Sequence, residues 1–184
     1  MKKALVAASL LISTAVLVTG FTQGFKGIRE FLTGYEEVPA VSTVASAVFN
    51  ARISDDETSL EYELSYTDLE GAVQQAHIHF GQRGVNGGIS VWLCGNASAG
   101  PPPINPPAGT PACPPSPATV TGTLTAANVV GPAGQGIAAG EFAELVGGIR
   151  AGRTYANVHS TKFPGGEVRS QIEPGGGNGH SRHK

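Results

Sequence analysis

The sequence predicts an all-β domain: antiparallel strands arranged as a Greek-key-like β-sandwich or a flattened barrel, with one short helix near the C-terminal part. Three observations support this fold class. Seven or eight short segments alternate apolar and polar residues, as half-buried strands do. Turn-forming residues separate them, and glycine and proline alone make up 26 and 13 of the 184 residues. One segment, residues 140–152, carries apolar side chains at helical spacing.

The first third of the chain predicts an edge strand and a hairpin. Residues 31–39 form a short edge strand that ends in a corner, because Pro39 has no N–H for a sheet ladder. Residues 44–53 and 60–66 follow as antiparallel strands around the turn-forming sequence Ser-Asp-Asp-Glu. The second of these strands places four large apolar residues on one face: Leu60, Tyr62, Leu64 and Tyr66. We therefore expect one buried and one solvated face in this hairpin.

The most distinctive segment is a strand with two histidines, residues 73–81. Strict alternation places His77 and His79 on one face of this strand. Ala76 and Ile78 then lie on the opposite, apolar face. The histidine face is polar in a strand that is otherwise suited to the core.

A glycine-rich return follows the histidine strand. Residues 81–88 contain four glycines, which allow a tight turn into the next strand at 89–93. A phosphate-binding loop is excluded, because no helix and no Gly-Lys-Ser/Thr ending follows. A further strand is expected at 118–124. Trp92 is expected to pack between the sheets and Tyr155 to lie in the core.

The C-terminal half predicts one helix and two more strands. Residues 140–152 form the helix, which Gly152 ends and which lies across an open end or side of the sheets. Its apolar face carries residues at positions i, i+3, i+4 and i+7: Phe142, Leu145, Val146 and Ile149. Strands at 154–160 and 167–172 complete the fold, and alternation puts His159 on the polar face of the first.

The two ends of the chain predict segments outside the domain. Residues 1–20 resemble a secretory signal peptide, in which two lysines precede an apolar run of 15 residues, 4–18. That run is short for a membrane span. Cleavage is expected after Gly20, or as late as Gly24, and an uncleaved anchor is the alternative. Residues 174–184 are rich in glycine and polar side chains, which predicts a disordered tail.

Charge and cysteine content limit the function classes. Removing Lys2 and Lys3 with the leader leaves 10 basic against 14 acidic residues, a formal charge of −4, which excludes nucleic acid as a partner. Cys94 and Cys113 flank a proline-rich stretch and should form a disulfide in an oxidising compartment. The sequence therefore predicts a secreted or periplasmic protein with no membrane span once the leader is removed.

Several spaced motifs support a family resemblance. They are Leu32-Thr33-Gly34 with Glu37-Val38-Pro39, Ala76-His77-Ile78-His79-Phe80-Gly81 with Gly84, Gly87 and Gly88, Tyr155-Ala156-Asn157-Val158-His159-Ser160 after Ala151-Gly152, and Pro164-Gly165-Gly166-Glu167-Val168-Arg169-Ser170-Gln171-Ile172. The chain contains these motifs in this order and resembles the CHRD domain over residues 31–173. That module is repeated in the animal protein chordin and occurs singly in secreted bacterial proteins. The resemblance implies an extracytoplasmic all-β module. The growth-factor antagonism of chordin is not transferred, because this chain lacks its repeats and cysteine-rich modules.

A second, weaker resemblance exists at the level of motifs. The His-x-His strand, a glycine-bearing loop, a disulfide loop and a late histidine are similar to the arrangement in copper/zinc superoxide dismutase. His77, His79 and His159 match copper ligands of that family. The bridging histidine and the zinc-site residues have no counterpart in this chain, which puts a binuclear dismutase site in doubt.

The three histidines predict a metal site. Two imidazoles on one strand face can converge on one ion, and a third from a neighbouring strand would complete a three-nitrogen site. Copper is the expected ion, with zinc as an alternative. The competing hypothesis is structural: His77, His79 and His159 would be hydrogen-bonded polar residues that satisfy Asn157, Gln75 and backbone groups.

Four further polar residues belong to the same motifs. Glu37, Glu167 and Arg169 are expected to form an ion pair that joins the first edge segment to the last strand. Glu37 is alternatively an oxygen ligand, or an acceptor for a ligand imidazole. Asn157 is expected beside the ligands in a supporting role.

The sequence contains no Gly-x-Ser-x-Gly elbow and no recognisable pair of catalytic carboxylates, so hydrolase chemistry is not supported. We therefore expect metal binding or handling rather than turnover. The alternative function is a non-catalytic interaction or matrix module, whose partner would be an extracellular or periplasmic protein. A dismutase-like redox enzyme is the third hypothesis.

Overall fold

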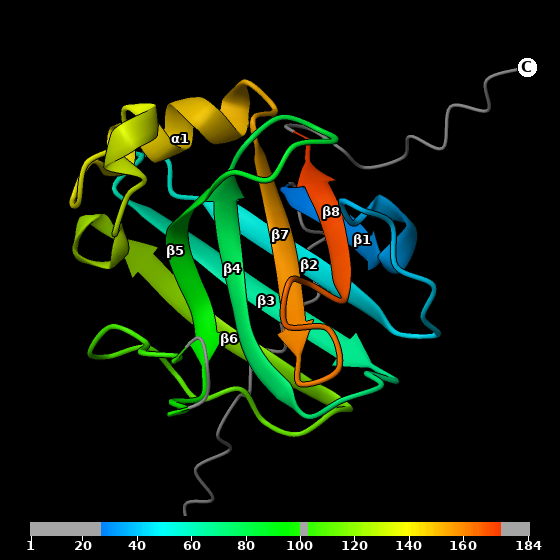
Figure 1. Ribbon diagram of the computed structural model, residues 1–184. Helices are drawn as coiled ribbons and strands as arrows, with labels where there is room; N and C mark the ends of the chain where they lie inside the picture. Colours follow the sequence, from blue (N-terminus) through cyan, green and yellow to red (C-terminus); the bar gives the residue numbers. More distant parts are fainter. Residues whose placement is uncertain (1–26, 100–102, 174–184) are drawn as a thin grey trace, which may run out of the picture.

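The computed structural model describes residues 27–99 and 103–173. They form one sheet of eight antiparallel strands in the order β5-β4-β7-β8-β1-β2-β3-β6, as Figure 1 shows. The strands are β1 (Ile28–Thr33), β2 (Ser46–Ile53), β3 (Ser59–Thr67), β4 (Val73–Phe80), β5 (Gly88–Gly95), β6 (Ala118–Thr125), β7 (Thr154–Ser160) and β8 (Val168–Ile172). The all-β class predicted from alternation is confirmed.

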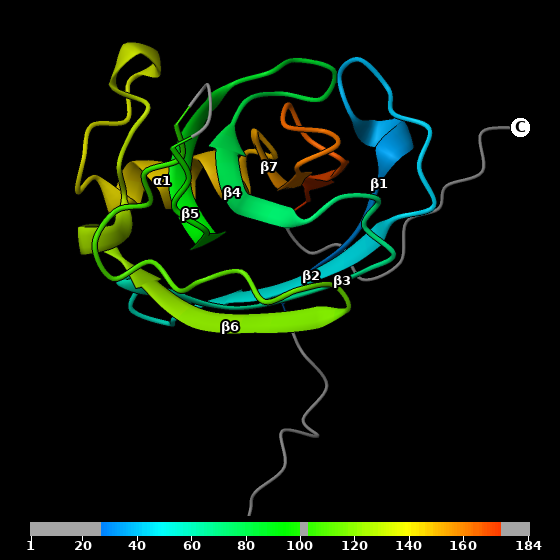
Figure 2. The same ribbon diagram turned by 60° about the horizontal axis from the view of Figure 1, so that its bottom comes forward.

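The sheet curls into a nearly closed, flattened barrel. Figure 2 shows β2, β3 and β6 as a layer beneath β5, β4 and β7. The two layers meet where β8 joins β1, through the pair of Thr33 and Arg169. On the opposite side the Tyr62 hydroxyl of β3 donates a hydrogen bond of 2.6 Å to the Leu93 carbonyl of β5. A buried bond of this kind holds the two layers together where no ladder does.

The core fills the space between these layers. Alternation determines which residues enter it: Leu60, Tyr62, Leu64 and Tyr66 of β3 are all buried, as the sequence predicts. Ala76 and Ile78 of β4 are both 0 % exposed on the inner face. The largest apolar side chains that complete the core are Leu32, Phe49, Leu93, Leu145, Ile149 and Ile172.

One α-helix, α1 (Phe142–Arg150), covers an end of the barrel, at the top of Figure 1. Its four predicted core residues are buried: Phe142, Leu145, Val146 and Ile149. Gly152 follows with a φ of +64°, the left-handed conformation that ends many helices. The described part of the chain also has three short 3₁₀-helices, at Gly34–Glu36, Ala126–Asn128 and Ala133–Gln135. Within the described residues no helix is long and apolar enough to span a membrane.

Two hairpins and the disulfide are confirmed, and one strand prediction is wrong. β2 pairs with β3, β7 pairs with β8, and Cys94 is bonded to Cys113 with their Cα atoms 5.0 Å apart. The expected edge strand near residues 31–39 is instead β1, an internal strand between β8 and β2. Pro39 lies after this strand, so it constrains the corner but not the ladder. The predicted leader and tail lie outside the described residues.

Candidate metal centre

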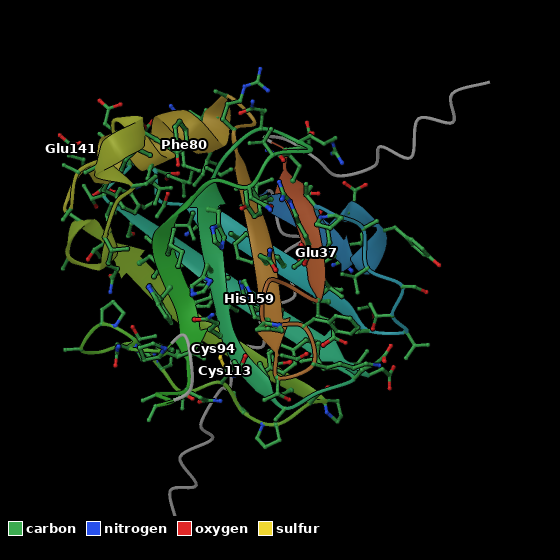
Figure 3. The ribbon with its side chains drawn as sticks, in the orientation of Figure 1. Glu37, Phe80, Cys94, Cys113, Glu141 and His159 are labelled. Atoms are coloured by element: carbon green, nitrogen blue, oxygen red, sulfur yellow. A yellow bond between two sulfur atoms is a disulfide. The ribbon has the colours of Figure 1, made fainter. Side chains whose placement is uncertain are left out.

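The outer face of β4 and β7 brings the three predicted histidines together. The strands pair antiparallel, with His77 opposite Asn157 and His79 opposite Tyr155. Because cross-strand partners share a face, His159 lies on the same side, opposite Gln75. His159 thus comes from the strand directly beside β4, as the predicted three-nitrogen site requires. Figure 3 shows His159 on β7, in the middle of this face.

The imidazole nitrogens are close enough to share one ion. His77 Nδ1 and His159 Nε2 are 3.3 Å apart. One ring nitrogen from each of His77, His79 and His159 lies within 4.8 Å of the others. Two nitrogens bound tetrahedrally at about 2.0–2.1 Å from a metal would be separated by about 3.3 Å. The observed spacing therefore suits both a shared ion and a direct imidazole–imidazole hydrogen bond.

Backbone carbonyls fix the tautomers of two histidines. His79 Nδ1 lies 3.0 Å from the Gly87 oxygen, and His159 Nδ1 lies 3.0 Å from the Pro164 oxygen. Since a carbonyl only accepts, each Nδ1 carries the hydrogen and each Nε2 keeps a lone pair. His79 Nε2 and His77 Nε2 are buried without a hydrogen-bond partner among the described residues. Histidines that bind metal ions in proteins are usually oriented in this way, by a hydrogen bond from the ring nitrogen that does not bind the metal.

Burial keeps the three imidazoles uncharged. The exposed fractions are 0 % for His77, 8 % for His79 and 6 % for His159. Desolvation, and then repulsion by His159, lowers the pKa of His79 to about 4. Desolvation likewise lowers the pKa of His159 to about 4. The pKa of His77 is well below its usual value, because of burial and its two histidine neighbours. At neutral pH the cluster is a set of neutral nitrogen donors, the form that binds metal.

Loops and Trp92 cover the cluster. Figure 1 shows the β7–β8 connection folding back over β7, which brings the Pro164 carbonyl to His159. The 81–88 return approaches from the other side with Gly87. A Cβ on Gly87 would lie 1.7 Å from the Phe80 oxygen, so only glycine fits there. Trp92, expected between the layers, is instead half-buried and edge-on to His77, with ring centroids 4.3 Å apart.

Tyr155 is buried, as the sequence predicts, but its side chain lies on the histidine face and not between the layers. Its ring is parallel to that of His79, at 2° and 4.7 Å between centroids. Its hydroxyl accepts a hydrogen bond of 3.1 Å from the Gly87 N–H. Alternation along β7 already places Tyr155 with His159, so this role was detectable from the pattern. The contact of Tyr155 with the 81–88 return could not be predicted from the sequence.

Glu37 lies on the β1 and β8 side of the same face, as Figure 3 shows, and bonds to Asn157. The Asn157 Nδ2 donates to Glu37 Oε2 at 3.4 Å. Glu37 Oε1 and Asn157 Oδ1 are buried with no partner among the residues described. Burial raises the pKa of Glu37 to about 7, against the opposing charge of Arg169. Glu37 and Asn157 therefore lie beside the cluster without contacting a histidine nitrogen through any hydrogen bond in the described chain.

The expected ion pair between Arg169 and the two glutamates is wrong. Arg169 donates instead to the Val85 oxygen at 2.8 Å and to Asn86 Oδ1 at 3.0 Å. Glu167 accepts from the Thr43 hydroxyl at 3.0 Å and from the Glu70 N–H at 2.8 Å. The glycine-rich return lies over β8 and captures the guanidinium, while Glu167 fixes the connections before β2 and β4. Both residues are structural supports of the loops around the cluster.

The curled antiparallel sheet with a buried histidine cluster on its outer face defines an all-β module with a candidate metal centre. The family model of the CHRD domain matches residues 29–172. The chain therefore belongs to the CHRD family, as its motifs indicate. CHRD domains are typical of extracellular proteins. No curated protein and no solved structure matches the chain.

Proposed function

We propose that this protein is an extracytoplasmic metal-binding module that holds a copper ion through His77, His79 and His159. Zinc is the alternative ion, since imidazole suits both. The protein would bind or transfer the ion and would not use it in catalysis. One observation carries the proposal: three buried, neutral imidazoles have ring nitrogens within 4.8 Å of one another, and two of them are oriented by backbone carbonyls.

The energetic cost of buried ring nitrogens without partners favours a metal-ligand role for the histidines over a purely structural role. A buried nitrogen lone pair without a partner costs about 1–3 kcal/mol. The cluster contains two such nitrogens, His77 Nε2 and His79 Nε2, among the described residues. Protonation does not relieve this cost, because burial lowers the pKa of all three imidazoles and neighbouring histidines lower those of His77 and His79 further. A metal ion would remove this cost at His79, whose Nε2 keeps the lone pair while Nδ1 donates to the Gly87 oxygen.

Metal analysis of the purified protein tests the proposal. The wild type should retain about one copper per chain after dialysis, and the His77→Ala/His79→Ala variant should retain far less. A matched control replaces the two remaining histidines of the chain, His180→Ala/His183→Ala, and should keep the ion. Equal, substoichiometric metal in the wild type and the His77/His79 variant would refute the proposal. Loss of metal only in the His180/His183 variant would assign it to adventitious binding.

A second candidate is a non-catalytic interaction module with structural histidines. The observation that favours it is the 3.3 Å contact of His77 Nδ1 with His159 Nε2, which is also a normal hydrogen-bond length. On this hypothesis a chelator leaves the wild-type melting temperature unchanged. Under the metal hypothesis the chelator lowers it, because an ion that binds only the folded state stabilises that state.

A further inference from the structure

The side chains of Arg169, Tyr155 and His79 form a stack on the histidine face. The guanidinium carbon of Arg169 lies 3.4 Å from the centroid of the Tyr155 ring. The opposite neighbour of that ring is the parallel imidazole of His79, at 4.7 Å. A permanent cation is thus held on the same face as the candidate ligands, with one aromatic ring between it and His79. Such cation–aromatic contacts are strongest when buried, and Arg169 is 2 % exposed.

The charge of Arg169 is poorly compensated. Its guanidinium donates to neutral oxygens, those of Val85 and the Asn86 amide. No ion pair involves it within residues 27–99 and 103–173. Two carboxyls interact with it, the buried Glu37 and the exposed Glu36, and burial raises the pKa of Glu37 to about 7. At pH 7 about half of that carboxyl is protonated, so it offsets only part of the positive charge.

We propose that the Arg169–Tyr155–His79 stack makes the histidine site prefer monovalent copper over divalent ions. The inference rests on the proposed metal site. Three neutral imidazoles leave the full charge of the bound ion in place. Repulsion from a fixed cation scales with that charge, so it disfavours a divalent ion twice as strongly as a monovalent one. Burial reduces screening, which makes the difference larger than it would be at the surface.

Arg169 also positions His79, and this second effect has to be separated from its charge. By binding Val85 and Asn86, the guanidinium holds the return whose Gly87 carbonyl orients the His79 ring. Loss of that support weakens binding of both ions together. Loss of the charge changes the ratio of the two affinities. Arg169→Lys keeps the charge without the two-pronged hydrogen bonding, and Arg169→Gln removes the charge.

The experiment measures affinities for Cu⁺ and Zn²⁺ by competition with chromophoric chelators, anaerobically and with ascorbate for Cu⁺. In Arg169→Gln the ratio of Cu⁺ to Zn²⁺ affinity should fall about tenfold, as expected for one charge about 10 Å from the ion at an effective dielectric constant near 20. Arg169→Lys should keep the ratio while weakening both ions. Arg83→Gln removes an exposed cation from the same return and should leave the ratio unchanged.

Three outcomes decide the matter. An unchanged ratio in Arg169→Gln overturns the selectivity, although the metal site itself stands. A wild type that binds neither ion overturns the proposed function instead. If Arg169→Gln does not fold, Glu37→Gln decides: at pH 8.5 it removes a negative charge near the site, so the ratio should rise. No rise there also overturns the selectivity.

Discussion

Acid should destabilise the metal-free protein through its three buried histidines. In the folded state their pKa values lie below the usual 6.5, at about 4 for His79 and His159 and lower than usual for His77. A group with a depressed pKa binds its proton in the unfolded chain first. Its contribution to the free energy of unfolding is therefore complete above pH 6.5 and is lost as the pH falls towards 4.

Two glutamates act in the opposite direction. Burial raises the pKa of Glu37 and of Glu30 to about 7. Their contribution is complete below pH 4.5 and is lost as the pH rises through 7. Between pH 4.5 and 6.5 the unfolded chain thus binds three more protons on histidine and two fewer on glutamate. The difference of one proton makes the free energy of unfolding fall by about 1.4 kcal/mol for each pH unit of acidification.

Urea unfolding of metal-free protein from pH 4.5 to 6.5, followed by fluorescence, measures this slope. Trp92 is the one tryptophan of the chain and lies against His77, so it reports on the cluster directly. Glu37→Gln removes one opposing group and should roughly double the slope, to about 2.7 kcal/mol per pH unit. A stability that rises on acidification, or parallel profiles for wild type and Glu37→Gln, would refute the assignment of neutral histidines and a protonated carboxyl.

Three further predictions concern single contacts. Reduction of the Cys94–Cys113 disulfide should lower the free energy of unfolding by roughly 3 kcal/mol, measured by urea unfolding with and without dithiothreitol. Tyr62→Phe should cost about 1–2 kcal/mol, because the buried Leu93 carbonyl loses its donor; an unchanged urea midpoint would contradict this. Gly87→Ala should weaken metal binding about 10- to 100-fold by displacing the carbonyl that orients His79. Gly134→Ala, where an added Cβ meets no atom within 4 Å and the backbone is not left-handed, is the control and should retain affinity in the same titration.

Alternation predicted the strands and the faces of their side chains well. His77 and His79 are predicted on one face and Ala76 and Ile78 on the other, and in the structure only the second pair joins the hydrophobic core. The helix could be predicted equally well, because four apolar residues at helical spacing form one face that has to be buried. Local periodicity determines these features, and long-range contacts do not alter them.

The partners of the polar residues could not be predicted in the same way. Alternation indicates which side chains share a face, but not which loop covers that face. Arg169 was assigned to glutamates, yet the 81–88 return supplies its acceptors from more than 80 residues away in the chain. Trp92 was expected in the core because of its size, although its cross-strand pairing with His77 places it on the outer face. Burial of polar groups by loops leaves no periodic signal in the sequence.

The position of β8 in the sheet has a consequence for how the chain folds. β8 is the last strand in sequence but lies between β7 and β1, where it joins the two layers. The N-terminal strands β1 to β3 therefore cannot be closed into a barrel until residues 168–172 have been synthesised. Contacts of such high sequence separation make folding slow. Arg169 belongs to this final strand, so the electrostatics of the histidine site are established in the same step that closes the barrel.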